Sequence, residues 1–224
     1  MRPLRLLFIG NSATYVHDIP GTLCRLAGAA GYPMEAASVT KGGYTLTQHA
    51  ASDSDHGKSV LAAIQKGWDV VFLQDNGNCV SSPEMEDASR GACRTLIAAI
   101  RDTGAVPSIY VRPPYGKENA GRSPFEQCIA FDRLFCSIAA ENDAKTVFVN
   151  RAFALAMHST DLPLWGPDNG HTSEQGAYLA VCTFFSALTG VSSSVLGTNG
   201  LDSEEARTLQ NIADAISLEK RIPW

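Results

Sequence analysis

The sequence predicts an α/β fold, in which a parallel sheet of about five strands is covered by helices on both faces. Short apolar runs alternate with longer segments of helical periodicity along the whole chain, and this is the pattern of repeated β-α-β units. The 224 residues are 45% hydrophobic and 18% charged, as in ordinary globular domains. Since no repeat or linker-like segment divides the chain, we expect one domain over residues 1–224.

Five short apolar runs predict the strands. The first run begins at Leu4 and stops at Gly10, and the run over 68–74 is the most continuously apolar. Strands buried on both faces of a parallel sheet have such runs. The predicted strands cover residues 4–9, 34–39, 68–74, 105–111 and 145–150.

The segments between these runs have helical spacing. Ile19, Leu23 and Leu26 share one face of the first long segment. Pro83 and Pro124 suit the first turns of two others, because proline lacks the N–H that a first turn leaves unpaired. The predicted helices cover residues 19–31, 59–67, 83–103, 123–142, 152–158, 172–188 and 203–218.

Charge and composition exclude several classes of protein. The net charge is −5, and no cluster of Lys and Arg suggests binding to nucleic acid or to an anionic membrane. No run approaches a membrane span, and none has the form of a signal peptide, so we expect a cytoplasmic protein. The six cysteines lack metal-ligand spacing, which predicts free thiols and no zinc site. They are Cys24, Cys79, Cys93, Cys128, Cys136 and Cys182.

Two separated stretches together suggest a nucleophilic enzyme. Ser12 follows the first strand directly, at the sheet edge where open α/β folds bind ligands. A small polar residue there can also serve only the turn. Near the other end of the chain, Asp168 stands three residues before His171. A serine, a base and a carboxylate that orients the base are the parts of an acyl-transfer triad.

Two further loops follow predicted strands. Gly42 and Gly43 permit either a tight turn or a backbone N–H that faces a ligand. The polar run over 75–78 either forms an ordinary loop or supplies an amide donor to an oxyanion site. The sequence alone leaves both alternatives open.

Taken in order, these four clusters resemble the conserved blocks of the SGNH/GDSL hydrolases. Gly10-Asn11-Ser12 resembles the first block, Gly42-Gly43 the second, residues 75–78 a degenerate third, and residues 168–171 the Asp-x-x-His block. Two positions depart from the pattern. Asn11 replaces the usual Asp before the serine, and Gln74 stands where the third block has glycine.

The resemblance implies a flavodoxin-like three-layer α/β/α sandwich with strand order 2-1-3-4-5, and no metal or organic cofactor. It also implies that Ser12 is the nucleophile, His171 the general base and Asp168 its orienter. The backbone N–H groups of Ser12 and Gly43 would form the oxyanion hole with a side-chain amide. We choose Asn76 for that amide, with Gln74 second and Asn78 third. The reason is that Gln74 shares a strand face with Phe72 and Val70, whereas Asn76 lies past the strand end.

We therefore predict a serine esterase that hydrolyses a small ester through an acyl-serine intermediate. A short acyl group, such as acetyl on a carbohydrate, is the first choice of substrate. The enzymatic alternative is a thioesterase or a lysophospholipase-like acyl hydrolase. The alternative from another class is a non-catalytic carbohydrate-binding relative of the fold. The expected partner is a small-molecule ester, without nucleic acid or membrane.

Other residues near these loops have less definite roles. His17 could line the pocket, but a surface or capping role fits its position better. His49 and His56 lie in a polar stretch without strand-end placement. Tyr115 and Trp165 flank the predicted site, where each could contact substrate or simply pack.

Overall fold

The computed structural model describes residues 2–218 and 222, and its centre is a five-stranded parallel sheet. The strand order is β2-β1-β3-β4-β5, which confirms the predicted three-layer α/β/α fold and its strand order. The strands are β1 (Leu4–Gly10), β2 (Met34–Thr40), β3 (Val70–Leu73), β4 (Val106–Val111) and β5 (Lys145–Phe148).

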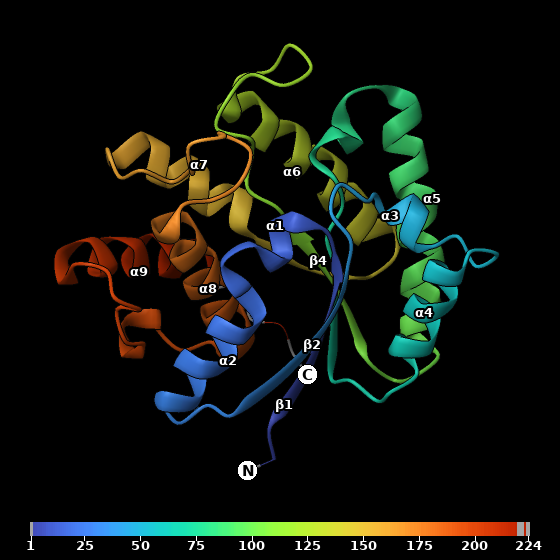
Figure 1. Cartoon of the computed structure of the whole chain (residues 1–224), viewed down its shortest axis with the longest axis horizontal. Coiled ribbons are helices and arrows are strands. Elements are labelled where there is room, and N and C mark those ends of the chain that lie inside the picture. Colours follow the sequence, from blue (N-terminus) through green and yellow to red (C-terminus); the bar gives the residue numbers. More distant parts are fainter. Residues whose placement is uncertain (1, 219–221, 223–224) are drawn as a thin grey trace.

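Helices cover both faces of the sheet (Figure 1). Side chains alternate along each strand, so Phe8 and Phe72 enter one apolar layer while Leu7 and Val71 enter the other. The first layer is completed by α2 (Ile19–Ala29), α7 (Val149–Ser159), α8 (Glu174–Thr189) and α9 (Ser203–Ser217). The second is completed by α4 (Asp55–Ile64), α5 (Pro83–Arg101) and α6 (Pro124–Glu141).

Helix α8 packs against the sheet through an aromatic cluster. Phe184 makes edge-to-face contacts with Phe8, Phe72 and Tyr110, with ring centroids 4.8–5.4 Å apart. Such aromatic pairs add about 0.5–1.5 kcal/mol each beyond the area they bury. Because α8 follows His171 by only three residues, this packing fixes the position of the loop that carries the histidine.

Several short elements were not predicted from the sequence. They are α1 (Ser12–Tyr15), η1 (Val16–Asp18), α3 (Leu46–His49), η2 (Gly77–Val80) and η3 (Ser193–Val195). Helix α4 also begins at Asp55, four residues before its predicted start at Ser59, because Ser54 accepts a capping hydrogen bond of 2.9 Å from the Gly57 N–H. A helix of one turn is too short to show periodicity. Side-chain caps begin all of these elements except η1.

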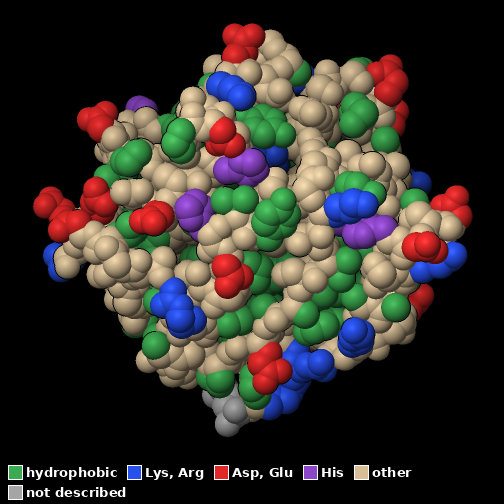
Figure 2. Space-filling model, viewed as in Figure 1, with side chains coloured by type: hydrophobic (Ala, Val, Ile, Leu, Met, Phe, Trp, Pro, Cys, Tyr) green, Lys and Arg blue, Asp and Glu red, His purple; other side chains and the backbone are tan. Residues whose placement is uncertain are grey.

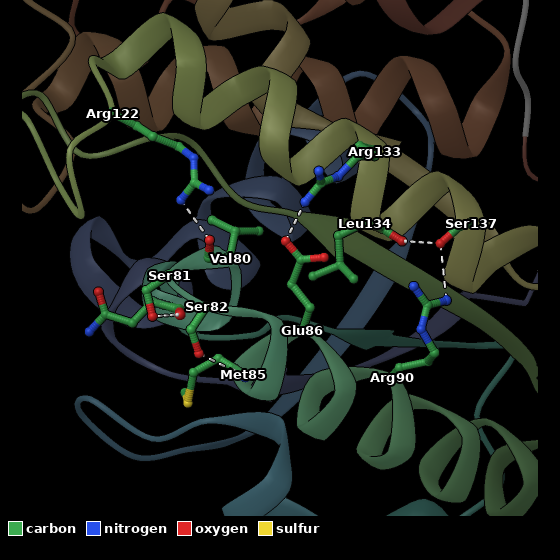
Figure 3. A network of polar contacts seen from close by, with 11 residues as sticks. Val80, Ser81, Ser82, Met85, Glu86, Arg90, Arg122, Arg133, Leu134 and Ser137 are labelled. Atoms are coloured by element: carbon green, nitrogen blue, oxygen red, sulfur yellow. Dashed lines mark hydrogen bonds and ion pairs between the residues drawn. The ribbon is translucent and has the colours of Figure 1, made fainter.

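A polar network joins α5, α6 and η2 (Figure 3). Arg133 on α6 forms an ion pair with Glu86 on α5, and Arg90 donates a 3.0 Å hydrogen bond to Ser137. Arg122, which precedes α6, donates to the carbonyl oxygen of Val80 at 2.6 Å. The last contact holds η2, the short helix that follows Asn76.

The surface and the thiols agree with the composition. The six cysteines, all within the described residues, are thiols that form no disulfide. Acidic and basic side chains are interspersed on the face drawn in Figure 2, and that face has no extended basic patch. Over residues 2–218 and 222, no helix combines the length and the apolar character needed to span a bilayer.

Candidate active site

The loops after β1, β2 and β3 meet the loop that precedes α8 at the carboxyl edge of the sheet. Ser12, Gly43, Asn76 and His171 line one cavity of about 310 Å³. Its remaining lining residues are Asn11, Ala13, Arg112, Tyr115 and Gly170. The structure therefore brings together residues that the sequence separates by up to 160 positions, 11 to 171.

Ser12 is placed by the cap of α1. Asn11 precedes it, and the Oδ1 of Asn11 accepts a 3.1 Å hydrogen bond from the Ala13 N–H. The Nδ2 of Asn11 donates to the carbonyl oxygen of Tyr44 at 2.9 Å. An aspartate could accept the first bond but could not donate the second. Asparagine at this position thus ties the serine turn to the loop after β2.

Gln74 holds the same turn from the other side. Its Oε1 accepts hydrogen bonds from the Asn11 N–H at 2.9 Å and from the Thr14 Oγ1 at 3.0 Å. The side chain is 1% exposed and does not line the cavity. A Cβ at Gly10 would lie 2.6 Å from this Oε1, so the close approach requires glycine there. These contacts are those of a positioning residue.

His171 and Asp168 form a direct pair. The Nδ1 of His171 lies 2.5 Å from the Oδ2 of Asp168, whose Oδ1 accepts from the N–H groups of Gly170 at 2.9 Å and of His171 at 3.0 Å. These three hydrogen bonds hold the pKa of the Asp168 carboxyl well below its usual range, and the bond from the Gly170 N–H has the largest effect. A carboxylate only accepts hydrogen bonds, so Nδ1 carries the proton and Nε2 is free to accept one.

The amide donors of the site differ in their partners. The N–H groups of Ser12 and Gly43 donate to no residue within 2–218 or 222. The Nδ2 of Asn76 donates to the Gly43 carbonyl oxygen at 2.8 Å, which uses one of its two hydrogens. Its Oδ1 accepts from the Asn78 N–H at 3.0 Å. Asn78 turns its own Oδ1 to the Nδ2 of Asn119, at 3.1 Å, and does not line the cavity.

Asp75 is a positioning residue. In the sequence it is recognisable only as part of the polar run over 75–78. It is buried, and its carboxylate accepts from the N–H groups of Leu46 at 2.8 Å and Asn76 at 2.7 Å and from the Ser89 hydroxyl at 2.5 Å. Burial raises the pKa of this carboxyl, and the hydrogen bonds oppose that rise. Asp75 thereby joins the loops that carry Gly43 and Asn76.

Two histidines set aside in the sequence support the loop after β2. His49 is buried, and its Nδ1 lies 2.9 Å from the Nε2 of His56. Both rings pack edge-on against Tyr44, at 5.6 and 5.0 Å between centroids. Burial, and to a smaller extent the neighbouring His56, lowers the pKa of His49 to about 4. The polar composition of residues 51–56 gave no signal of this packing.

His17 also connects parts of the site. Its Nε2 lies 2.9 Å from the Thr172 carbonyl oxygen, so its side chain reaches the loop of His171 instead of capping a helix. The backbone of His17 is left-handed, with φ of 58°.

A second, smaller hollow lies on another side of Ser12 and His171. It measures about 10 Å³, and its walls include Val16, Pro113, Pro114, Trp165 and Thr172. The Nε1 of Trp165 donates to the Pro114 carbonyl oxygen at 3.0 Å, and its ring packs on Phe153 at 5.7 Å. Trp165 is therefore held rigidly as a wall of this hollow, while Tyr115 lines the larger cavity.

We find no cluster of three or more His, Cys, Asp or Glu side chains suited to a metal ion in the described part of the chain. The site is built from one serine, one His–Asp pair and amide donors.

Comparisons with known proteins were made at the level of sequence and of structure. No protein-family model matches the chain, and no curated protein matches it. Among solved structures, a protein from Slackia heliotrinireducens described as a candidate SGNH hydrolase is 25% identical, with a TM-score of 0.68 over 80% of this chain and 96% of that one.

Two other solved structures are similar at lower identity. A DUF4886 family protein from Bacteroides uniformis has a TM-score of 0.78 and is 18% identical over 96% of this chain and 94% of its own. The acetylxylan esterase Axe2 from Geobacillus stearothermophilus has a TM-score of 0.58 and is 18% identical over 78% of this chain and 89% of its own. As the sequence motifs predict, the fold of this chain is that of the SGNH/GDSL hydrolases.

Proposed function

We propose that the protein is a serine esterase that removes acetyl groups from a larger polar alcohol, such as a carbohydrate. The observation that carries this proposal is the pair of unequal hollows that share Ser12 and His171. The hollow of about 10 Å³ has the volume of roughly one water molecule, so it admits a methyl-sized group and no longer chain. The cavity of about 310 Å³ has room for the alcohol.

The proposed reaction begins at Ser12. Its Oγ attacks the acetyl carbonyl carbon while the Nε2 of His171 takes the hydroxyl proton. The negative charge on the carbonyl oxygen is stabilised by the N–H groups of Ser12 and Gly43 and by the second Nδ2 hydrogen of Asn76. The ester C–O bond then breaks, and the alcohol leaves with the proton from His171.

Water completes the cycle. It gives a proton to the Nε2 of His171 and attacks the acetyl-Ser12 carbon, and the Ser12 oxygen leaves and recovers that proton. The charge of Asp168 stabilises the imidazolium in both steps. The Oγ of Ser12 makes no hydrogen bond to another described residue in this structure, and in free enzymes such bonds often tighten only when substrate binds.

Three features support this proposal over its alternatives. The small hollow has no space for the long acyl chains of a lysophospholipase. The short His171–Asp168 pair orients a general base beside Ser12, which a purely sugar-binding protein does not need. The similar solved structures include an acetylxylan esterase, which favours acetyl esters as the class to test first.

Acyl chain length tests the proposal. We expect kcat/KM for p-nitrophenyl acetate to exceed that for the butyrate by about 10- to 100-fold, since overfilling a packed hollow costs about 1–3 kcal/mol. Trp165→Leu enlarges the hollow and should reduce this preference, while Phe125→Leu, an exposed aromatic on α6, serves as the matched control. A preference for octanoyl or palmitoyl esters would contradict the acetyl assignment.

A further inference from the structure

Among the described residues, Arg112 is the one Lys or Arg side chain that lines both hollows. It follows β4 directly, where its run Val111-Arg112-Pro113 leaves the sheet. The residue is 4% exposed. A buried arginine keeps its charge, and structures pair that charge because an unpaired buried cation is unfavourable.

The protein provides hydrogen-bond partners for only some of the donors of this guanidinium. The Nε donates to the Pro113 carbonyl oxygen at 2.9 Å, and the group stacks on the Tyr115 ring at 4.2 Å. Neither Nη group donates a hydrogen bond to any residue within 2–218 or 222, and no carboxylate of that part forms an ion pair with it. Two parallel donors therefore remain for a ligand.

The surroundings hold the guanidinium in place. Gly77 provides the space, because a Cβ there would lie 2.5 Å from the Nη1 of Arg112 and from the Tyr115 ring. The Tyr115 N–H is in turn held by the Oε1 of Gln127 at 2.9 Å. The guanidinium is thus packed between a backbone turn and an aromatic ring, with Ser12 and His171 in the same cavity.

We propose that the Nη groups of Arg112 bind a carboxylate carried by the alcohol part of the substrate, so that the enzyme acts on acetyl esters of hydroxy acids or sugar acids. This proposal rests on the proposed function. A planar guanidinium donates two parallel bonds to a carboxylate. One arginine balances the single charge of one carboxylate. The small hollow takes the acetyl methyl group, so the carboxylate must lie on the alcohol.

Matched aryl acetates test the proposal. We expect kcat/KM for meta- or para-acetoxybenzoate to exceed that for the corresponding acetoxybenzamide by about 10- to 100-fold, the range of a charged hydrogen-bonded contact. Arg112→Gln should remove this preference, so that in the variant kcat/KM for the benzoate falls to that for the benzamide. Arg112→Lys should keep part of it. Arg133→Gln removes an exposed arginine on α6 and should change nothing.

A role of Arg112 in balancing the buried charge of Asp75 predicts a different pattern. Both esters would then lose activity equally in Arg112→Gln, and that result would overturn the proposal. Product inhibition of the wild type gives a second readout that needs no variant. We expect the Ki of hydroxybenzoate to be at least about tenfold lower than that of hydroxybenzamide, and equal values would also overturn the proposal.

Further outcomes show whether the carboxylate lies on the alcohol or on the acyl group. They also distinguish failure of the Arg112 proposal from failure of the proposed function. An Arg112-dependent preference for p-nitrophenyl hydrogen succinate over the acetate would place the carboxylate on the acyl side and refute the alcohol assignment. If acetoxybenzoate and acetoxybenzamide are hydrolysed at equal rates, only the role of Arg112 is refuted. Failure to hydrolyse any acetate would refute the proposed function itself.

Discussion

Replacing Asn76 by alanine tests the assignment of the third oxyanion donor. The Nδ2 of Asn76 has two hydrogens, and the bond to the Gly43 carbonyl oxygen at 2.8 Å uses one. Loss of the other removes a donor to the transition state, which costs about 2.7–4 kcal/mol, or 10² to 10³ in kcat. Loss of the Gly43 bond costs about 0.5–1.5 kcal/mol of folding free energy. The first loss appears in kcat and the second in urea unfolding.

Two variants nearby make this prediction specific. Asn78→Ala is the matched control, because Asn78 is the same residue type two positions away, and its Oδ1 accepts from the Nδ2 of Asn119 outside the cavity. It should keep kcat within about threefold of wild type. Gln74→Ala leaves the Asn11 N–H and the Thr14 hydroxyl without their buried acceptor, so it should cost about 1–3 kcal/mol of stability for each group. If Gln74→Ala lowers kcat by 10² or more while Asn76→Ala stays within threefold, the donor is Gln74 and our reasoning is refuted.

The other predictions concern the serine turn, the buried histidine, metals and domain organisation. Asn11→Asp cannot donate to the Tyr44 carbonyl oxygen, so chemical denaturation should show a loss of about 1–3 kcal/mol; unchanged stability would contradict the role given to Nδ2. An unfolded histidine binds its proton near pH 6.5, whereas folded His49 stays neutral to about pH 4. The wild type should therefore lose up to about 3 kcal/mol of stability as the pH falls between these values. His49→Leu should lack this loss and the control His158→Gln should retain it, and the same pH dependence in His49→Leu would contradict the prediction. Esterase activity should survive extended dialysis against EDTA, and a loss restored by zinc or manganese would indicate another mechanism. Thermal unfolding should show a single transition, as expected of one domain over residues 1–224, while two separate transitions would contradict that organisation.

The sequence predicted the sheet and the position of the candidate site because both depend on local patterns. Buried runs such as residues 70–73 specify strands, and a parallel sheet places all the following loops at one edge. The strand order came from the family resemblance, and the structure confirms it.

Residues whose roles depend on long-range contacts could not be predicted in this way. His49 and His56 lie in a polar stretch, yet they pack on Tyr44 beside the glycine loop. Arg112 follows a strand as many rim residues do, and only the fold shows it beside Ser12. Gln74 departs from the family pattern, and its hydrogen bond to the Asn11 N–H across 63 positions explains the residue. None of these contacts leaves a periodic or spacing signal in the sequence.

The turnover of p-nitrophenyl acetate by wild type and by Ser12→Ala tests the central claim most directly. Ser12 makes no side-chain hydrogen bond to the other described residues, so its replacement should leave folding unchanged, which circular dichroism and the unfolding midpoint can verify. We predict that Ser12→Ala loses activity by a factor on the order of 10⁴ to 10⁶. If a folded Ser12→Ala protein keeps more than about a tenth of the wild-type rate, the nucleophile lies elsewhere.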